Sequence, residues 1–279
     1  MEFKTGYNVK PESINLLGEV TYTDGTNSIT PNQKECEAYG YTYDEATGTC
    51  KAYMFNTNLN ANVDNSNNVI RGKNNTTFSG TNNTYIMGEN NIVRGLSRNN
   101  IVVGSNNEID NSINNTTVLG TKGISTADNS IVLGGNAGSD ILGERQTIQL
   151  MYGTQTTAGG TVDSYLNNVT NSFFVIPDNS IMFFHAYVLA VRVGGSAGEG
   201  AVGDYASFVE RGVVINKSGT LSIQREKDTI KTSGVVTDWR PVANVSGTNF
   251  RITVRGETNT TVEWNSTINF TEIKTGVTL

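Results

Sequence analysis

The stretch NNIVVGSNNEIDNSINNTTVLG, residues 99–120, contains the pattern that decides the fold of this chain. It begins and ends with one hexapeptide: Asn, then Asn, Thr or Ser, any residue, an apolar residue, any residue, and Gly. Self-similarity at a short period is typical of repeat architectures. Seven copies occur: NNVIRG (67–72), NTTFSG (75–80), NTYIMG (83–88), NNIVRG (90–95), NNIVVG (99–104), NTTVLG (115–120) and NSIVLG (129–134).

An apolar residue stands two positions before the final Gly of every copy. Side chains alternate between the two faces of a strand, so this column faces one way and is expected to be the buried core of a stalk. A disordered segment has no reason to space Val and Ile so evenly, and Asn, Thr and Gly are poor helix formers. The predicted core residues are Ile70, Phe78, Ile86, Val93, Val102, Val118 and Val132.

Each unit is expected to hold a short strand and a tight turn. Gly suits a turn because it tolerates left-handed backbone angles, and Asn, the next best residue there, replaces it in NANVDN (60–65) and NNEIDN (106–111). Two units per coil give roughly five coils, and stacked Asn side chains can bond along them. The predicted turn residues are Gly72, Gly80, Gly88, Gly95, Gly104, Gly120 and Gly134.

Such thin coils cannot bury both faces of their strands within one chain. The column on the other face is mixed, since Ile101 and Leu133 are apolar whereas Arg71 and Arg94 are charged. Three chains around an axis would bury one column within each chain and one between chains. The repeat therefore predicts a homotrimeric β-roll or β-solenoid.

Composition and charge narrow the class of partner. The 279 residues are 36% hydrophobic, with an excess of Asn, Thr, Ser and Gly that favours a β-rich fibrous architecture. The net charge of −6 argues against nucleic acid or an anionic membrane as the main partner. The N-terminus lacks an apolar signal region, and the longest apolar run, around residues 181–193, is too short to be inserted across a membrane. We expect a soluble protein made in a cytoplasm.

Three regions follow one another along the chain. Residues 1–57 form a short Tyr-rich segment, residues 58–143 hold the repeat, and residues 144–279 alternate strand-like runs with turn signals. Several strands without a helical period indicate an antiparallel β-sandwich or jelly roll at the C-terminal end. The sequence therefore predicts an all-β chain.

The two cysteines, Cys36 and Cys50, flank a stretch with alternating tyrosines and a DEATG turn, which indicates a β-hairpin. A hairpin can bring its ends close enough for a disulfide. Synthesis in a cytoplasm favours two reduced thiols instead. Two cysteines without a neighbouring His are too few ligands for a metal site.

The sequence contains no constellation of residues typical of an enzyme. His185, the sole histidine, lies in a strand pattern and is expected to be structural. Nucleophile-elbow, zinc-protease and phosphate-loop motifs are absent, and the Gly-rich stretch 194–204 contains no Lys. Scattered acids are candidates for a glycosidase pair but are usually solvated: Asp163, Asp178, Glu199, Asp204 and Glu210. We expect no enzymatic activity, no cofactor and no metal.

Aromatic residues of the C-terminal region offer a second kind of site. Trp239 and Trp264 are candidates for stacking on sugar faces at the surface. Packing in the core is the alternative for both.

The repeat resembles the head repeats of trimeric autotransporter adhesins, in which N-S-x-A-x-G units build a trimeric β-roll, and NSIVLGGNA (129–137) matches best. Related repeats occur in bacteriophage fibres. The C-terminal region resembles a β-domain found at the end of phage fibre proteins, through ERQTIQLMYGTQTT, IPDNSIMFFHAYVLAVRV, FVERGVVI and FRITVRGETNTTVEWNSTINF. The segment CEAYGYTYDEATGTC (36–50) is similar to modules in structural proteins of crAss-like phages.

The resemblance implies a trimeric virion fibre, assembled in the host cytoplasm and anchored to a capsid or tail protein by residues 1–57. The expected form is a capsid-attached head fibre with a C-terminal knob that adheres to a host surface or its polysaccharide. Alternatives are a tail fibre, a tailspike-like polysaccharide depolymerase, and a cellular trimeric adhesin, although the last requires an export signal.

Overall fold

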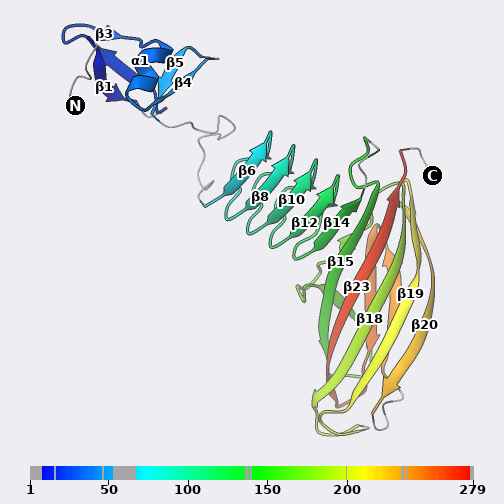
Figure 1. Ribbon diagram of the computed structural model, residues 1–279. Helices are drawn as coiled ribbons and strands as arrows, with labels where there is room; N and C mark the ends of the chain where they lie inside the picture. Colours follow the sequence, from blue (N-terminus) through cyan, green and yellow to red (C-terminus); the bar gives the residue numbers. More distant parts are fainter. Residues whose placement is uncertain are drawn as a thin grey trace. The chain divides into compact units, whose positions relative to one another are not determined.

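The computed structural model describes residues 8–15, 17–45, 47–52, 67–135, 138, 140–198, 200–233, 236 and 238–276. Its architecture is all-β, as the sequence predicts. The chain divides into two compact units, Met1–Ala61 and Asn62–Leu279. The repeat and the C-terminal region therefore share one unit (Figure 1).

The first unit is a small β-structure with a short helix. Strands β1 (Lys10–Ile14), β2 (Val20–Thr23) and β3 (Ser28–Ile29) form an antiparallel sheet, whereas β4 (Thr42–Asp44) and β5 (Thr49–Lys51) form a hairpin. Helix α1 (Gln33–Ala38) precedes the hairpin. The core of this first unit includes Val20 and Tyr22, both buried.

Cys36 and Cys50 are joined by a disulfide, which corrects the expectation of reduced thiols. The predicted hairpin exists, but Cys36 lies on α1 rather than at the start of the hairpin. Asn32 and Glu35 form a capping box, in which each side chain accepts a hydrogen bond from the other residue's backbone N–H, and this box starts the helix. The disulfide therefore joins the helix to the hairpin.

Residues 67–135 form a β-solenoid of about four turns, where the sequence predicts roughly five coils. The first three steps between long strands are 16 residues, as in the hydrogen bond from the Asn107 backbone N–H to Asn91 Oδ1, and the last step pairs Val118 with Val132, 14 residues on. One turn thus contains two hexapeptide units. Five long strands stack in parallel: β6 (Val69–Lys73), β8 (Tyr85–Glu89), β10 (Ile101–Ser105), β12 (Thr117–Thr121) and β14 (Ile131–Gly135). Four short strands form a second parallel sheet: β7 (Thr76–Thr77), β9 (Ile92–Val93), β11 (Glu108–Ile109) and β13 (Ile124–Ser125).

A thin column of side chains fills the solenoid. Fully buried apolar residues come from both sheets: Ile86, Val93, Val102, Ile109, Val118 and Val132. Ile70, in the first solenoid strand β6, is only partly buried. Phe78 is not part of the core, because its side chain is 42% exposed and Thr77 takes the inward position.

The prediction of a buried Phe78 is wrong because this copy of the repeat is shifted by one residue relative to the turn stacked on it. Asn75 stacks on Asn91, and Thr77 pairs with Val93 in the neighbouring short strand. Asn75 is five positions before Gly80, whereas its stacking partner Asn91 is four positions before Gly95. Gly80 therefore packs against Leu96 rather than Gly95, and Leu96 takes the left-handed φ of 62° in that turn.

Asn side chains hydrogen bond from one turn of the solenoid to the next. Asn91 Nδ2 donates to Asn75 Oδ1 and to the Gly104 carbonyl oxygen, both at 2.9 Å. Asn107 repeats the arrangement with Asn91 and Gly120. These amides are buried, so they satisfy backbone groups that water cannot reach.

Most of the repeated Gly residues lie within strands, where they let the backbones of successive turns pack closely. The prediction that they lie in turns is therefore corrected. Five of them lie in the long strands, and an added Cβ on Gly104 would lie 1.8 Å from the Gly120 carbonyl oxygen. The left-handed corner before each of the last four long strands is an Asn. Gly95 is in a turn without positive φ, and the five strand residues are Gly72, Gly88, Gly104, Gly120 and Gly134.

The sheet of long strands continues without interruption into the C-terminal region. Strand β15 (Arg145–Thr156) pairs antiparallel with β14, and then β23 (Thr261–Lys274), β18 (Ser180–Gly194), β19 (Tyr205–Lys217) and β20 (Thr220–Thr232) follow in order. Figure 1 shows these strands as the tall curved layer after β14. The solenoid and this layer therefore share one continuous face.

A smaller sheet faces the tall layer. It consists of β16 (Thr161–Leu166), β17 (Phe174–Val175), β21 (Arg240–Ser246) and β22 (Asn249–Arg255). Aromatic rings fill the space between, with Phe250 contacting Phe184 and Phe270 at centroid distances of 5.1 and 5.0 Å. The apolar inner face of each long strand is buried there.

Polar contacts join the last solenoid turn to the tall layer. Gln146 Oε1 accepts from the Ile124 backbone N–H at 2.9 Å, and Gln146 Nε2 donates to Glu272 Oε2 at 2.7 Å. Asn167 Nδ2 donates to the Asp128 carbonyl oxygen at 2.9 Å. The solenoid is therefore fixed to the C-terminal region by partly buried hydrogen bonds as well as by strand pairing.

Candidate functional site

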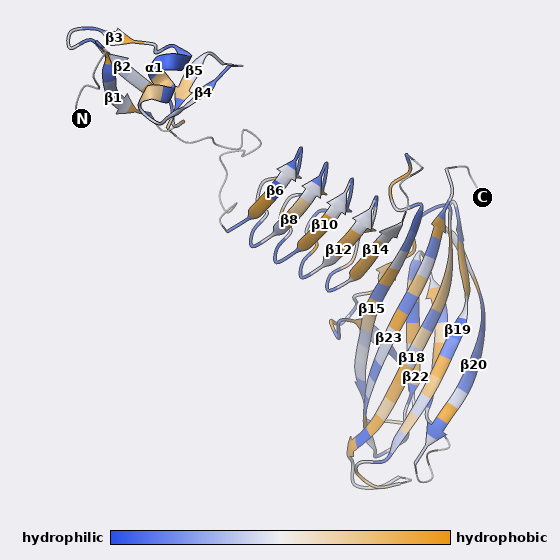
Figure 2. Cartoon of the chain, viewed as in Figure 1, coloured by the Kyte–Doolittle hydropathy of each residue, from blue (hydrophilic) through white to orange (hydrophobic). Residues whose placement is uncertain are grey.

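The outer face of the tall layer, turned away from the aromatic core, carries an unusual density of exposed apolar side chains. Strand β18 alone presents Phe183, Tyr187 and Leu189, which are 48%, 51% and 46% exposed. Figure 2 shows apolar residues in orange along β18 and on the solenoid strands. Exposed apolar side chains gathered on one face mark an interaction surface more often than isolated ones do.

The same face of the sheet extends from the C-terminal region onto the solenoid, with exposed apolar residues at both ends and polar residues of β15 and β23 between them. Leu133 of β14 is paired with Thr147 of β15, and the same row continues through Thr271 to Phe183. Directly paired residues point to the same side of a sheet, so the exposed Leu133 and Phe183 share one face. We call this continuous surface the outer face.

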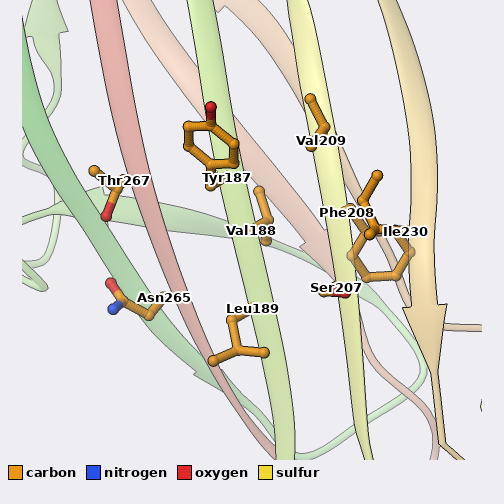
Figure 3. A pocket seen from close by; sticks show the side chains of 9 residues that line it. All are labelled: Tyr187, Val188, Leu189, Ser207, Phe208, Val209, Ile230, Asn265 and Thr267. Atoms are coloured by element: carbon orange, nitrogen blue, oxygen red, sulfur yellow. The ribbon is translucent and has the colours of Figure 1, made fainter.

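A shallow hollow of about 550 Å³ lies at the middle of the outer face (Figure 3). Tyr187 and Leu189 from β18 and Val209 from β19 line it, with Ile230 of β20 at one side. Asn265 and Thr267 of β23 border the other side. The hollow is thus mainly apolar with one polar border.

His185 lies in the next row of the outer face. Its ring is 4.5 Å from the Tyr187 ring, centroid to centroid, and Arg211 and Asn269 are its strand partners. The structure therefore places the sole histidine on the surface rather than in the core.

Both tryptophans lie in the core, which confirms the core packing favoured from the sequence and corrects the candidate role in stacking on sugars. Trp239 and Trp264 are each 2% exposed, with ring centroids 6.2 Å apart. Trp264 Nε1 donates to Thr156 Oγ1 at 3.0 Å. The alternation of side chains along β23 directs Trp264 inward, and Trp239 packs against it in the core.

A second hollow, of about 440 Å³, opens at the edge between the two layers. We call it the basic cleft, because four cationic side chains line it together with Thr161 and Thr253. Arg225 and Lys227 come from β20, Arg240 from β21 and Arg255 from β22. Sequence reasoning missed this cluster, since the four residues are brought together only by the pairing of distant strands.

Two glutamates are buried and have perturbed pKa values. Desolvation raises the pKa of Glu272 to about 7, although the hydrogen bond from Gln146 opposes the shift. Desolvation also raises the pKa of Glu210, against a hydrogen bond from the Ala243 backbone N–H and the charge of Arg225. Each keeps one carboxylate oxygen without a hydrogen-bond partner among the described residues.

The other scattered acids have structural surroundings. Asp163 Oδ2 accepts from Arg251 at 2.9 Å, and Asp204 accepts from the Ala201 backbone N–H. Glu199 lies outside the described residues. Within the described part of the chain, no three His, Cys, Asp or Glu side chains are grouped closely enough to hold a metal ion.

No protein-family model and no curated protein matches the sequence. Among solved structures, the chain is similar to the tailspike protein of Acinetobacter baumannii phage AM24, with a TM-score of 0.31 and 9% identity over 78% of this chain and 52% of that chain. It is also similar to the tailspike of Acinetobacter baumannii bacteriophage Fri1, a capsular polysaccharide depolymerase, with a TM-score of 0.27 and 8% identity over 76% of this chain and 48% of that chain. The chain spans about half the length of these tailspikes.

The Fri1 tailspike is a depolymerase, so the expectation that the chain is not an enzyme is withdrawn, and a TM-score of 0.27 assigns no activity to this chain. At TM-scores this low, the function proposed below rests on the chain's own residues.

Proposed function

We propose that this chain is a subunit of a tailspike-like virion fibre, in which three copies associate along their outer faces and display the C-terminal region to a host surface. The observation that carries the proposal is the outer face, one face of a single sheet that presents exposed apolar side chains on the solenoid and on β18, with polar residues of β15 and β23 between them. A second copy of the chain offers the same extended apolar surface, which is the property that a symmetric interface requires.

The solenoid supports the rod-like part of this function. Its Asn ladder and backbone stacking hold each turn in one register, while its single buried column leaves Ile101 and Leu133 exposed on the other face. Burial of these side chains between copies removes apolar surface from water. Three copies around one axis bury one such face in each chain.

The proposal assigns attachment to the N-terminal segment and contact with the host to the C-terminal region. Residues 1–57 would hold the fibre on a capsid or tail protein, and the separate compact unit Met1–Ala61 is consistent with that division. Three C-terminal regions in one fibre, and many fibres on one particle, would strengthen weak contacts by raising their effective concentration.

The interface is tested with a charge placed at the hollow. Leu189→Glu puts a carboxylate in the middle of the outer face and is expected to lower the solution mass from that of a trimer to that of a monomer. Val175→Glu is the matched control, since Val175 is 53% exposed on β17 and alternates with the buried Phe174, so it points away from the tall layer. A Leu189→Glu protein that stays trimeric would refute this interface.

The location is tested on purified particles. An antibody fragment raised against the C-terminal region, labelled with gold, is expected to decorate virions at the tail. Decoration should vanish when residues 1–57 are deleted, while the truncated protein stays trimeric in solution. Incorporation of the deleted protein at normal levels would refute the attachment role, and labelling only on capsid faces would refute the tail location.

A further inference from the structure

The basic cleft concentrates positive charge that the protein itself does not neutralise. Arg240 and Arg255 are direct cross-strand partners between β21 and β22. Like charges placed directly opposite each other destabilise a sheet. Arg225 and Lys227, two residues apart on β20, add two more charges from the same side of that strand.

Ion pairs within the described residues offset only a small part of this charge. Arg225 Nη1 lies 3.5 Å from Glu210 Oε2, and the other three cations make no ion pair there. Glu210 is fully buried, and burial raises the pKa of its carboxyl group. Among the described residues, this one ion pair therefore offsets at most one of the four charges, in a chain whose net charge is −6.

Two further contacts hold the cations in place. Arg255 Nε donates to the Gly159 carbonyl oxygen at 3.2 Å, and Lys227 Nζ lies 6.0 Å from the centroid of the Phe208 ring. Arg240 is exposed at the start of β21. A planar guanidinium can bind a carboxylate through two parallel hydrogen bonds, so the cleft presents preorganised donors for carboxylate groups.

We propose that the basic cleft binds an acidic polysaccharide through its carboxylate groups, and this inference rests on the proposed function as a surface-exposed fibre. The hydroxyl groups of Thr161 and Thr253 lie beside the cations and suit the hydroxyl groups of a sugar. No aromatic side chain is among the lining residues, so the cleft offers no platform for stacking on a neutral sugar or a nucleotide base. Recognition by charge is what remains.

The probe for this inference is a hyaluronan oligosaccharide, which carries a carboxylate in every disaccharide, with neutral dextran oligosaccharide as the comparison. Titration calorimetry on the full chain at low salt is expected to show binding of hyaluronan and none of dextran. The affinity should fall as salt is raised, because exposed charge pairs are screened. Poly-glutamate at equal charge is expected to bind at least about tenfold more weakly, since it lacks the sugar hydroxyl groups.

The residues are tested by removing one charge at a time. Arg240→Gln is expected to weaken hyaluronan binding by about tenfold, the loss expected for a charge-assisted hydrogen bond. Arg211→Gln is the matched control, because it removes one exposed charge from the outer face, where Arg211 pairs with Glu226 and Asp228. Its affinity for hyaluronan should not change. Lys227→Gln supplies an independent second variant in the cleft.

Four outcomes would overturn the inference: no binding of hyaluronan at low salt, equal binding of dextran, equal binding of poly-glutamate, or equal losses for Arg240→Gln and Arg211→Gln. The mass of each sample, measured by light scattering, shows whether the protein is a trimer and so tests the proposed assembly independently of hyaluronan binding. A trimer that does not bind hyaluronan refutes the cleft alone, whereas a monomer that binds it refutes the assembly alone.

Discussion

The solenoid and the C-terminal region are built from the same continuous sheet by opposite means. In the solenoid every turn contacts the turn 14 or 16 residues away, and buried Asn side chains share the interior with a thin apolar core. In the C-terminal region Gln149 of β15 reaches Asn269 of β23, 120 residues along the chain, and clustered aromatic rings form the core. Repetition stabilises the first region and long-range packing the second, so the two should respond differently to matched substitutions.

The largest expected difference comes from removing one ring in each region. Phe250→Ala deletes a fully buried ring that contacts Tyr152, Phe184 and Phe270, and should lower the free energy of unfolding by about 3–5 kcal/mol. Phe78→Ala is the same change at an exposed position of the solenoid and should cost less than about 1 kcal/mol. Urea denaturation measures both. Equal losses would mean that Phe78 is buried in the assembled protein or that Phe250 is not a central core residue.

A second substitution tests the close stacking of the solenoid. Gly104→Ala places a Cβ 1.8 Å from the Gly120 carbonyl oxygen at a residue with φ of 130°, and should destabilise the protein by about 3 kcal/mol through overpacking and strain. Gly135→Ala is the control, since a Cβ there meets no atom within 4 Å. The thermal unfolding midpoint should fall for the first variant only. Similar midpoints for the two variants would contradict the register of β10 on β12.

The smallest expected effect concerns the junction between the two regions and depends on pH. Glu272 has a pKa of about 7 in the folded chain against 4.5 for an ordinary Glu, so the folded state holds its proton over that window while the unfolded state releases it. The contribution of this group to stability is therefore complete below pH 4.5 and is lost as pH rises to about 7. The loss is at most about 3 kcal/mol.

Glu272→Gln removes that titration and keeps an oxygen that can accept from Gln146 Nε2. The variant should gain stability relative to the unaltered protein as pH rises from 4.5 to 7, measured by urea denaturation across that range. Gln155 and Glu263 form a matched but exposed pair on the outer side, so Glu263→Gln should leave the pH profile unchanged. Parallel profiles for Glu272→Gln and the unaltered protein would show that Glu272 is solvated.

The sequence predicts the structure of the solenoid in far more detail than that of the C-terminal region. Evenly spaced apolar residues identify Ile86, Val102, Val118 and Val132 as buried, because a stacked strand places every copy in the same environment. The slip at Phe78 escapes the pattern, since the choice between Thr77 and Phe78 depends on which Asn stacks on which. A six-residue motif does not contain that information.

In the C-terminal region the sequence predicts strands but not their partners. Arg240, Arg255 and Arg225 are unremarkable as separate letters, and only the order of strands brings them to one cleft. Likewise, Glu272 has no local signal of burial, because its neighbours Gln146 and Ile124 lie more than 100 residues earlier in the sequence. The exposed stripe on β18 is visible as a run that is apolar at nearly every position, FFHAYVLAVRV, with His185 and Arg192 as the exceptions, and one small sheet cannot cover both of its faces.

The measurement that tests the central claim most directly is the solution mass of the unaltered full chain by analytical ultracentrifugation at micromolar concentration. Burial of the outer face between three copies predicts one species of about three times the chain mass of 30.1 kDa, which stays assembled on dilution. A stable monomer of 30.1 kDa would contradict the claim, because the apolar outer face would then lie open to water in the native protein.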